Sequence, residues 1–329
     1  MNMQYWTTRA SLAIATVLLL MMSGCTDFLQ DDRDICCVDC KSNITLQYRY
    51  IREKKDEFGA FVHKMNHYLF DEAGVFMTEL PSNPASPQEL HLPVLEKGKY
   101  QVLTIGNMGT SVALLPALKK GVTKLSDLTL SLTGDDSAPR GNVDELFWNT
   151  QAVEVAEGQC GQIYLCDMAN IHCHLEIYVV WKKTPPYDGD YTFRLSNLSG
   201  EYRLDPSRDY GLEVIDGVTH RFPAYTDKKA VHEKTERLFN LSLKTEMITL
   251  RYYDDRMPIL QIFHGDKAVS RPLDLTTAFR EWGWRVSARP EQIYKIQATI
   301  FDDGSVVLEP WVEGTVLDWI DGGTVQVRK

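Results

Sequence analysis

The sequence predicts an all-β fold of two tandem β-sandwich domains with a few short helices. Many segments alternate apolar and polar residues with a period of two, which is the pattern of half-buried strands. Turn signals rich in Gly, Asp and Pro separate these segments at short intervals. Helical signals are few. Many short strands, frequent turns and few helices are typical of sandwich architectures.

The first half of the chain opens with its clearest strand. Ile44, Leu46, Tyr48 and Tyr50 share one face, and polar residues share the other. A hairpin is expected around Asp71–Gly74, because glycine adopts the positive φ of a tight turn. The other strands expected in this half are Leu90–Val94, Tyr100–Ile105, Leu128–Leu132, Phe147–Trp148 and Ala152–Val155.

The second half contains the longest β-prone segment, Ile163–Trp181, and a strong hairpin turn at Asp302–Ser305. One face of the long segment carries Ile171, Cys173, Leu175, Ile177, Val179 and Trp181. Further strands are expected at Tyr191–Leu195, Met247–Tyr253, Ile259–Phe263, Tyr294–Ile300 and Val306–Leu308.

Capping signals predict two short helices. Ser111 is expected to cap a helix through Lys120, with Gly121 as its stop. Asp274 is expected to cap a second helix that ends near Trp282.

Length and turn signals place a domain boundary near residue 158. The predicted segments are a signal peptide at 1–24, an acidic, Cys-rich tether at 25–42, an N-terminal sandwich at 43–158 and a C-terminal sandwich at 159–329. Removing 24 of the 329 residues leaves 305, enough for two domains of about 150 residues.

Cys25 follows a short apolar run and is the predicted lipidation site. The run from Leu12 to Met22 has eleven residues, whereas a bilayer-spanning helix needs about 20. Arg9 supplies the positive flank, and Ser23 and Gly24 supply small residues before the cut. A small pair directly before cysteine resembles the lipobox of bacterial lipoproteins. The resemblance implies cleavage between Gly24 and Cys25, acylation of the Cys25 thiol with chains such as palmitate, and attachment to the membrane. The alternative is an ordinary secretory signal with an incidental cysteine.

The charge of the chain excludes some partners. The net charge is −10, and Arg9 is the only charged residue before Cys25, so the remaining chain carries about −11. An acidic balance argues against binding nucleic acid and against electrostatic attraction to anionic lipid.

Six further cysteines form two clusters whose pairing the sequence leaves open. An exported protein can form disulfides, and six cysteines allow 15 full pairings. Zinc is the alternative, because His172 and His174 flank Cys173. In a strand, however, Cys173 faces away from both histidines, so we predict buried thiols or disulfides and no metal site. The clusters are Cys36, Cys37 and Cys40, then Cys160, Cys166 and Cys173.

The order of several segments resembles the FimB/Mfa2 family of fimbrial anchor subunits in Bacteroidetes. The resemblance spans nearly the whole mature chain and rests on order and spacing. An acidic segment, Gln30–Asp32, follows the lipid cysteine and resembles an export signal. The alternating strand and the hairpin Tyr68–Phe76 come next. Glu96–Val102 then leads into Ile105–Asn107, and Gly314–Trp319 lies near the end. It departs from the family at Ile105, where an aromatic is usual, and at the Cys-rich 36–40 segment.

This resemblance implies two transthyretin-like β-sandwiches at the base of a pilus, lipid-anchored in the outer membrane and exposed at the cell surface. Its partners would be fimbrial shaft pilins, joined by β-strand addition to an open sheet edge or groove. In the family's shaft subunits a trypsin-like protease removes the first strand after an arginine, whereas an anchor keeps that strand. Arg49 lies inside the first predicted strand and Arg52 just after it, so both are candidate protease sites and a shaft or tip pilin stays an alternative.

No enzyme motif stands out, and we predict neither catalysis nor a cofactor. His232-Glu233 lacks the second zincin histidine, and there is no nucleophile elbow, Walker loop or dinucleotide fingerprint. A glycan-binding surface lipoprotein is the alternative from another class. Its sugar platform would use Trp282 and Trp284 with Tyr252 and Tyr253, although such residues more often belong to the sandwich core.

Overall fold

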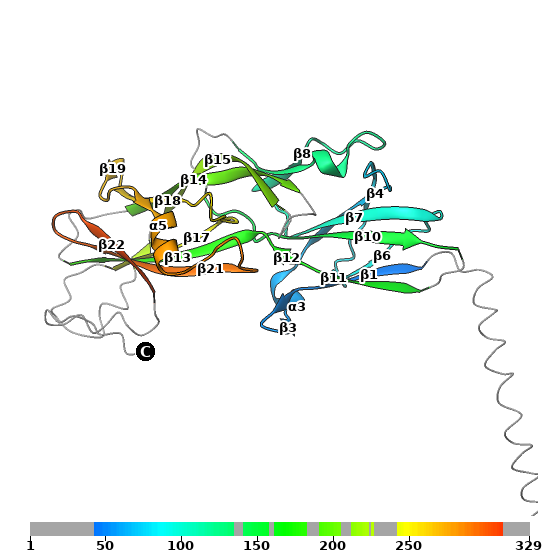
Figure 1. Ribbon diagram of the computed structural model, residues 1–329, viewed down its shortest axis with the longest axis horizontal. Helices are drawn as coiled ribbons and strands as arrows, with labels where there is room; N and C mark the ends of the chain where they lie inside the picture. Colours follow the sequence, from blue (N-terminus) through cyan, green and yellow to red (C-terminus); the bar gives the residue numbers. More distant parts are fainter. Residues whose placement is uncertain are drawn as a thin grey trace, which may run out of the picture.

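The structure, a computed structural model, describes residues 43–134, 141–157, 161–182, 191–204, 212–223, 225–226 and 242–311. Strands dominate these ranges and the helices are short, so the all-β fold class is confirmed. Most strands of the first half lie at one end of an elongated molecule, and most strands of the second half lie at the other (Figure 1). None of the helices in these ranges is long and apolar enough to span a bilayer.

The N-terminal sandwich consists of two facing sheets. The three-stranded sheet has the order β11-β1-β6, with β1 at Ile44–Arg49, β6 at Glu89–His91 and β11 at Gln162–Asp167. Alternate side chains of both sheets point inward and form one apolar core. The five-stranded sheet has the order β12-β10-β7-β4-β5, with β4 at Met65–Phe70, β5 at Phe76–Leu80, β7 at Gly98–Gly106, β10 at Phe147–Val155 and β12 at Ala169–Asn170.

The C-terminal sandwich has a five-stranded sheet, β16-β17-β13-β21-β22, and a seven-stranded sheet that includes β19-β18-β14-β9-β8. The predicted apolar face of the long segment is confirmed, because each of its residues is buried, most of them in the core of this sandwich. The first sheet contains β13 (His172–Trp181), β16 (Tyr225–Thr226), β17 (Ser242–Leu250), β21 (Gln292–Ile300) and β22 (Val306–Pro310). The second contains β8 (Val112–Leu115), β9 (Thr129–Leu132), β14 (Tyr191–Leu204), β15 (Leu212–Pro223), β18 (Ile259–His264), β19 (Lys267–Ala268) and β20 (Leu273–Asp274).

Strand pairing connects the two halves of the chain. β9 from the first half pairs with β14 from the second, and β11 from the second half pairs with β1. A further apolar cluster lies where the five-stranded sheet of the N-terminal sandwich meets β9 and the end of β14. Sheets are therefore shared across residue 158, and the division into 43–158 and 159–329 stays a prediction.

Two predicted hairpin turns are confirmed by their glycines. Gly74 has a φ of 74° and Gly304 a φ of 77°, values that favour glycine. In the first turn the Asp71 side chain accepts a hydrogen bond from the Val75 N–H at 2.8 Å. In the second turn the Asp303 side chain accepts from Ser305 N–H at 2.9 Å.

One predicted helix is confirmed and the other is wrong. Asp274 caps α5 (Leu275–Glu281) by accepting from Thr276 N–H at 2.8 Å. The segment after Ser111 instead forms β8, and the Ser111 hydroxyl bonds the Asp144 side chain. Pro116 disfavours a helical conformation for the residue before it, and β9 offers a pairing partner. The remaining elements are β2 (Ile51–Arg52), β3 (Lys55–Asp56), α3 (Phe58–Phe61) and the 3₁₀ turn Leu125–Asp127.

A candidate strand-docking edge in the N-terminal sandwich

The first strand is fully built into its sheet. β1 pairs in parallel with β11 along its whole length and antiparallel with β6 at Thr45–Gln47. Its inner side chains are buried, and the Tyr48 hydroxyl bonds Thr104 Oγ1 at 2.6 Å. If β1 were removed, β6 and β11 would flank an open groove over the core. In the intact protein β1 fills that groove.

The strand β10 in the facing sheet has an open edge. On one side β10 pairs with β7 along its whole length. On the other side β12 pairs only with Phe147 and Trp148, so within the described residues no strand pairs with Asn149–Val155 there. An open edge presents unpaired main-chain donors and acceptors, which can pair with another chain.

Side chains, and not a strand, connect this edge to β11. The Tyr164 hydroxyl lies 3.3 Å from Glu154 N and 3.5 Å from Glu154 O. The Asn149 side chain donates to Asp167 O at 3.0 Å, and the Cys166 thiol lies 3.6 Å from the Gln151 side-chain oxygen. The Tyr164 contacts satisfy the main-chain N–H and C=O of Glu154, which are part of the hydrogen-bonding groups along the β10 edge. An incoming strand would have to displace Tyr164.

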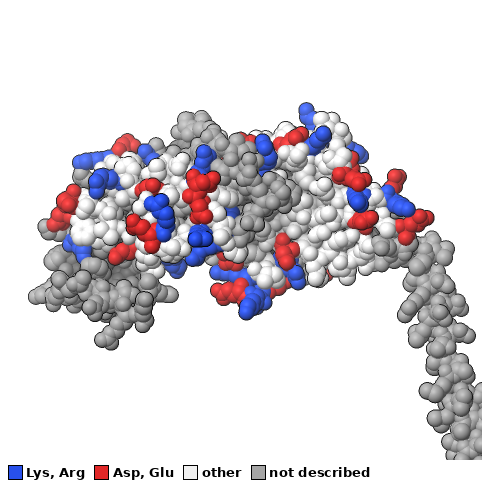
Figure 2. All heavy atoms as spheres, in the orientation of Figure 1, with Lys and Arg blue, Asp and Glu red and all other residues white. Residues whose placement is uncertain are grey.

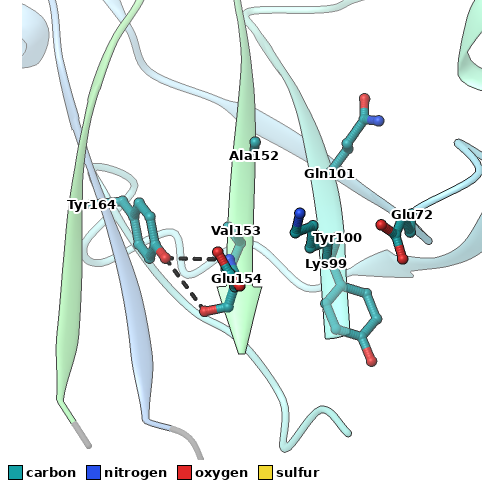
Figure 3. Close-up of a pocket in the computed structure, with 8 residues that line it drawn as sticks. All are labelled: Glu72, Lys99, Tyr100, Gln101, Ala152, Val153, Glu154 and Tyr164. Carbon is teal, nitrogen blue, oxygen red and sulfur yellow. Dashed lines mark hydrogen bonds between the residues drawn. The ribbon is translucent and has the colours of Figure 1, made fainter. Parts of the chain in front are cut away.

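A cavity of about 430 Å³ adjoins the edge (Figure 3). In this view Tyr164 points from β11 toward β10, and its hydroxyl meets Glu154 near the end of the strand. On β11, Ile163 is 66% exposed and Leu165 is 54% exposed, and both lie on the outer face of the strand, opposite Tyr164 and Cys166. The cavity is lined by Glu72, Lys99, Tyr100, Gln101, Ala152, Val153, Glu154 and Tyr164.

Charge is scattered over the face that Figure 2 shows, and both signs are mixed. A mixed cluster marks the place of the β2–β3 hairpin, and part of the N-terminal sandwich beside it carries no charge in this view. A surface of this kind suits recognition through main-chain pairing and apolar contact better than recognition of a highly charged partner.

The two candidate protease sites lie in different settings. Arg49 ends β1, and its guanidinium pairs with Asp167 at 2.8 Å. Arg52 lies in the β2–β3 hairpin and pairs with Glu291 at 2.9 Å, which joins the hairpin to the residue before β21. Cleavage after Arg49 would require local opening of the sheet. Both residues stay candidate sites.

Several predicted sites lie outside the described residues. These are the lipidation and cleavage site at Cys25 and Gly24, the acidic segment Gln30–Asp32, the Cys36–Cys40 cluster, Cys160 and Gly314–Trp319.

Cys166 and Cys173 are buried free thiols, one of the two states predicted for them. Burial raises the pKa of Cys166 to about 12, and burial likewise raises the pKa of Cys173. Neither thiol ionises near neutral pH, so neither is an activated nucleophile. Cys173 also faces away from His172 and His174, as the alternation predicts.

The aromatic residues considered for glycan binding pack inside the C-terminal sandwich. Tyr252 is buried, and Trp282 and Trp284 are partly buried against the core. The two tryptophan rings meet at 69°, so they do not form a coplanar platform. Trp311 stacks on Tyr178 with centroids 3.7 Å apart, which occupies one face of each ring. The geometry favours the core interpretation.

A comparison with protein families shows which family the chain belongs to. The family described as fimbrillin-A associated anchor proteins Mfa1 and Mfa2 matches residues 37–279. The chain belongs to this Mfa2 family. The family is one of structural fimbrial proteins at the cell surface, which gives the chain a fimbria-associated function and association with fimbrial subunits.

Solved structures share the fold at low sequence identity. The fimbrial anchor protein Mfa2 from Porphyromonas gingivalis aligns with a TM-score of 0.59 and 16% identity, over 83% of this chain and 98% of that one. A candidate polysaccharide-binding protein from Bacteroides thetaiotaomicron aligns with a TM-score of 0.63 and 17% identity, over 83% and 99%. A candidate adhesin from Bacteroides ovatus aligns with a TM-score of 0.60 and 15% identity, over 83% and 94%. A search of curated proteins gave no significant match.

Proposed function

We propose that this Mfa2-family chain is a lipid-anchored fimbrial anchor in the outer membrane. Acyl chains on Cys25 hold its N-terminus, and the sandwiches bind an extended segment of a fimbrial shaft subunit by strand addition. A single acyl chain binds a membrane only marginally, so durable attachment takes more than one chain. The observation that carries the proposal is the combination of a first strand that pairs on both of its sides and an open edge on β10.

An anchor, in contrast to a shaft subunit, would keep this first strand in place. β1 buries Ile44, Leu46 and Tyr48 between two partner strands. Losing such a strand would expose its apolar contacts at about 25 cal/mol per Å² and break the ladder on both sides. An N-terminus that stays attached through Cys25 keeps β1 in place. The groove is then unavailable to a neighbour, which ends the polymer at this subunit.

The β10 edge supplies what an incoming strand needs. Glu154 directs its N–H and C=O to Tyr164 and away from β7. Ala152 lies two residues earlier on the same strand and has the same orientation. An extended segment would pair with these groups and continue the five-stranded sheet, with net contributions of roughly 0.5–1.5 kcal/mol per hydrogen bond. Side chains on the incoming segment would contact Tyr164 of β11 and the other residues that line the cavity.

The test replaces one edge residue in two ways. Ala152→Pro removes a main-chain donor on the open side and leaves the β7 ladder intact, because proline is tolerated on sheet edges. Ala152→Thr keeps the N–H and favours a strand, so it is the matched control. We expect Ala152→Pro to weaken capture of fimbrial shaft subunits at least tenfold, with Ala152→Thr close to wild type, as measured by co-purification and titration. Capture by a folded Ala152→Pro variant at wild-type strength would overturn docking at this edge.

A further inference from the structure

A second cavity, of about 230 Å³, lies between the two sandwiches. The N-terminal sandwich contributes Tyr50 and Glu145 to its lining, and the C-terminal sandwich contributes His174, Glu246 and Tyr294. Neither the fimbrial function nor the sequence motifs account for this cavity. Its polar side chains include two histidines from successive positions on the face of β13 opposite the core.

Three side chains in this cavity converge on one point. His172 and His174 lie on the same face of β13, and their rings are 5.1 Å apart. Glu145 lies just before β10, and its Oε1 is 3.4 Å from His174 Nε2. One ligand-capable atom from each of the three residues lies within 4.8 Å of the other two. Ligand atoms around a tetrahedral Zn²⁺ ion, at about 2.0–2.1 Å from the metal, stand roughly 3.3 Å apart, so the three side chains would draw closer together on binding.

Partners outside the cluster orient both histidine rings. His172 Nδ1 lies 2.9 Å from Leu146 O, a group that only accepts. His174 Nδ1 lies 3.4 Å from Glu246 Oε1. The contact of His172 places its proton on Nδ1 and makes Nε2 the accepting nitrogen, whereas both nitrogens of His174 lie 3.4 Å from a carboxylate oxygen. A carbonyl or carboxylate on the second nitrogen is the usual partner of a metal-binding histidine.

The surroundings also fit a divalent cation. Glu145 and Glu246 supply two negative charges beside the cluster, whereas Arg251 hydrogen-bonds Asn170 O nearby and opposes them in part. Asn170 Nδ2 lies 3.2 Å from His172 Nε2 and would have to move aside for the metal.

We propose that Glu145, His172 and His174 bind a Zn²⁺ ion across the junction of the two sandwiches. Two imidazoles and one carboxylate are a zinc ligand set, with a fourth position open to water or to another ligand. Glu145 belongs to the N-terminal sandwich, and the histidines belong to β13 of the C-terminal sandwich, so the ion fastens one to the other. This proposal does not depend on the docking edge. It differs from the zinc alternative weighed for Cys173, whose thiol points into the core on the opposite face.

The test measures zinc binding to the purified full chain after removal of metal with a chelator. Cys36, Cys37 and Cys40 offer other zinc ligands, so the total zinc content of the wild type does not identify the site. The comparison of variants with the wild type does. We expect one zinc equivalent to be lost, or its affinity to fall at least tenfold, in Glu145→Gln and in His174→Ala. Glu246→Gln removes only the partner of His174 and should weaken the same equivalent roughly 10–100-fold. His63→Ala, an exposed histidine outside the cluster, is the matched control.

Two readouts separate a built site from chance binding. Zinc should raise the melting temperature of the wild type and of His63→Ala, but not of Glu145→Gln or His174→Ala. Cobalt in place of zinc should show the visible bands of a four-coordinate site in the wild type, and these bands should disappear in the same two variants. Wild-type zinc affinity and an unchanged thermal shift in both variants would overturn the proposal.

Discussion

Tyr48, His67 and Thr104 form a buried polar group in the N-terminal core. The Tyr48 hydroxyl lies 2.6 Å from Thr104 Oγ1, and His67 Nδ1 lies 3.1 Å from the same oxygen. The rings of Tyr48 and His67 also stack, with centroids 5.4 Å apart. The group fixes β1 against the facing sheet, since its members come from β1, β4 and β7.

Burial lowers the pKa of His67 to about 4, below the unfolded value of 6.5. Above pH 6.5 neither the folded nor the unfolded state binds this proton, so the free energy of unfolding is not reduced by protonation of His67. As the pH falls toward 4, the unfolded state takes up the proton first, so the free energy of unfolding decreases. We expect wild type to lose about 2 to 3 kcal/mol more than His67→Gln between pH 7.5 and 4.5, measured by urea unfolding with a chelator present. Equal losses in both proteins would contradict a buried, neutral His67.

Asn107 connects three segments around the end of β7. It has a φ of 59°, and its side chain accepts from His63 N–H at 2.8 Å. Its amide donates to Phe61 O at 2.7 Å and to Glu145 O at 3.0 Å. The preceding Gly106 is closely surrounded, because a Cβ there would lie 3.0 Å from Val62 Cγ1 and would require that side chain to shift.

Two substitutions of Asn107 separate its hydrogen bonds from its backbone. Asn107→Gly keeps the left-handed conformation and should lose roughly 2 to 3 kcal/mol of stability through the missing side-chain bonds. Asn107→Ala should lose about 1 kcal/mol more, because a Cβ disfavours positive φ. Denaturant unfolding of both variants gives the comparison. Equal stability of the two would show that the backbone conformation contributes nothing.

At the scale of elements, Tyr164 is the side chain that an incoming strand must displace. Tyr164→Phe removes the hydroxyl that bonds Glu154 and keeps the ring packed beside the core. We therefore expect this variant to bind fimbrial shaft subunits a few-fold more tightly, as measured by titration, with nearly unchanged melting temperature. Weaker binding would mean that the hydroxyl helps recognition and does not guard the edge.

The strands that periodicity predicted well are those with one face buried in a core and the other face outside it. β1 and β13 are examples, because each packs one face on a core and so alternates strictly. The helix expected after Ser111 does not form. Ser111 is a local capping signal, but Pro116 disfavours helical backbone before it, and β9 pairs with the segment as a strand. Local signals describe an element but not what it pairs with, which is why β11 beside β1 could not be predicted.

The same limit applies to the candidate sites. The β10 edge is open because of how the strands pair in the fold, and no residue type along Asn149–Val155 indicates this in the sequence. His172 and His174 do share a strand face that the sequence shows, since they are two residues apart. Their partner Glu145 lies far upstream in the chain, and only the fold brings it to them.

At the scale of the whole molecule, two sandwiches lie end to end and share contacts along their junction. The Arg52–Glu291 ion pair, the cluster with Glu145 and the apolar cluster between the five-stranded sheet of the N-terminal sandwich and β9 all cross it. A connected body of this kind can transmit tension from a bound fimbria to a tether at one end. We propose that this tether is the lipid on Cys25.

The most direct test is the distribution of fimbriae between cells and medium when Cys25→Ala replaces the wild-type chain. Without the thiol no acyl chain can attach, so the account predicts that fimbriae still assemble but are shed into the medium, while Cys166→Ala leaves them on the cells. Fimbriae retained on Cys25→Ala cells at the wild-type level would contradict it.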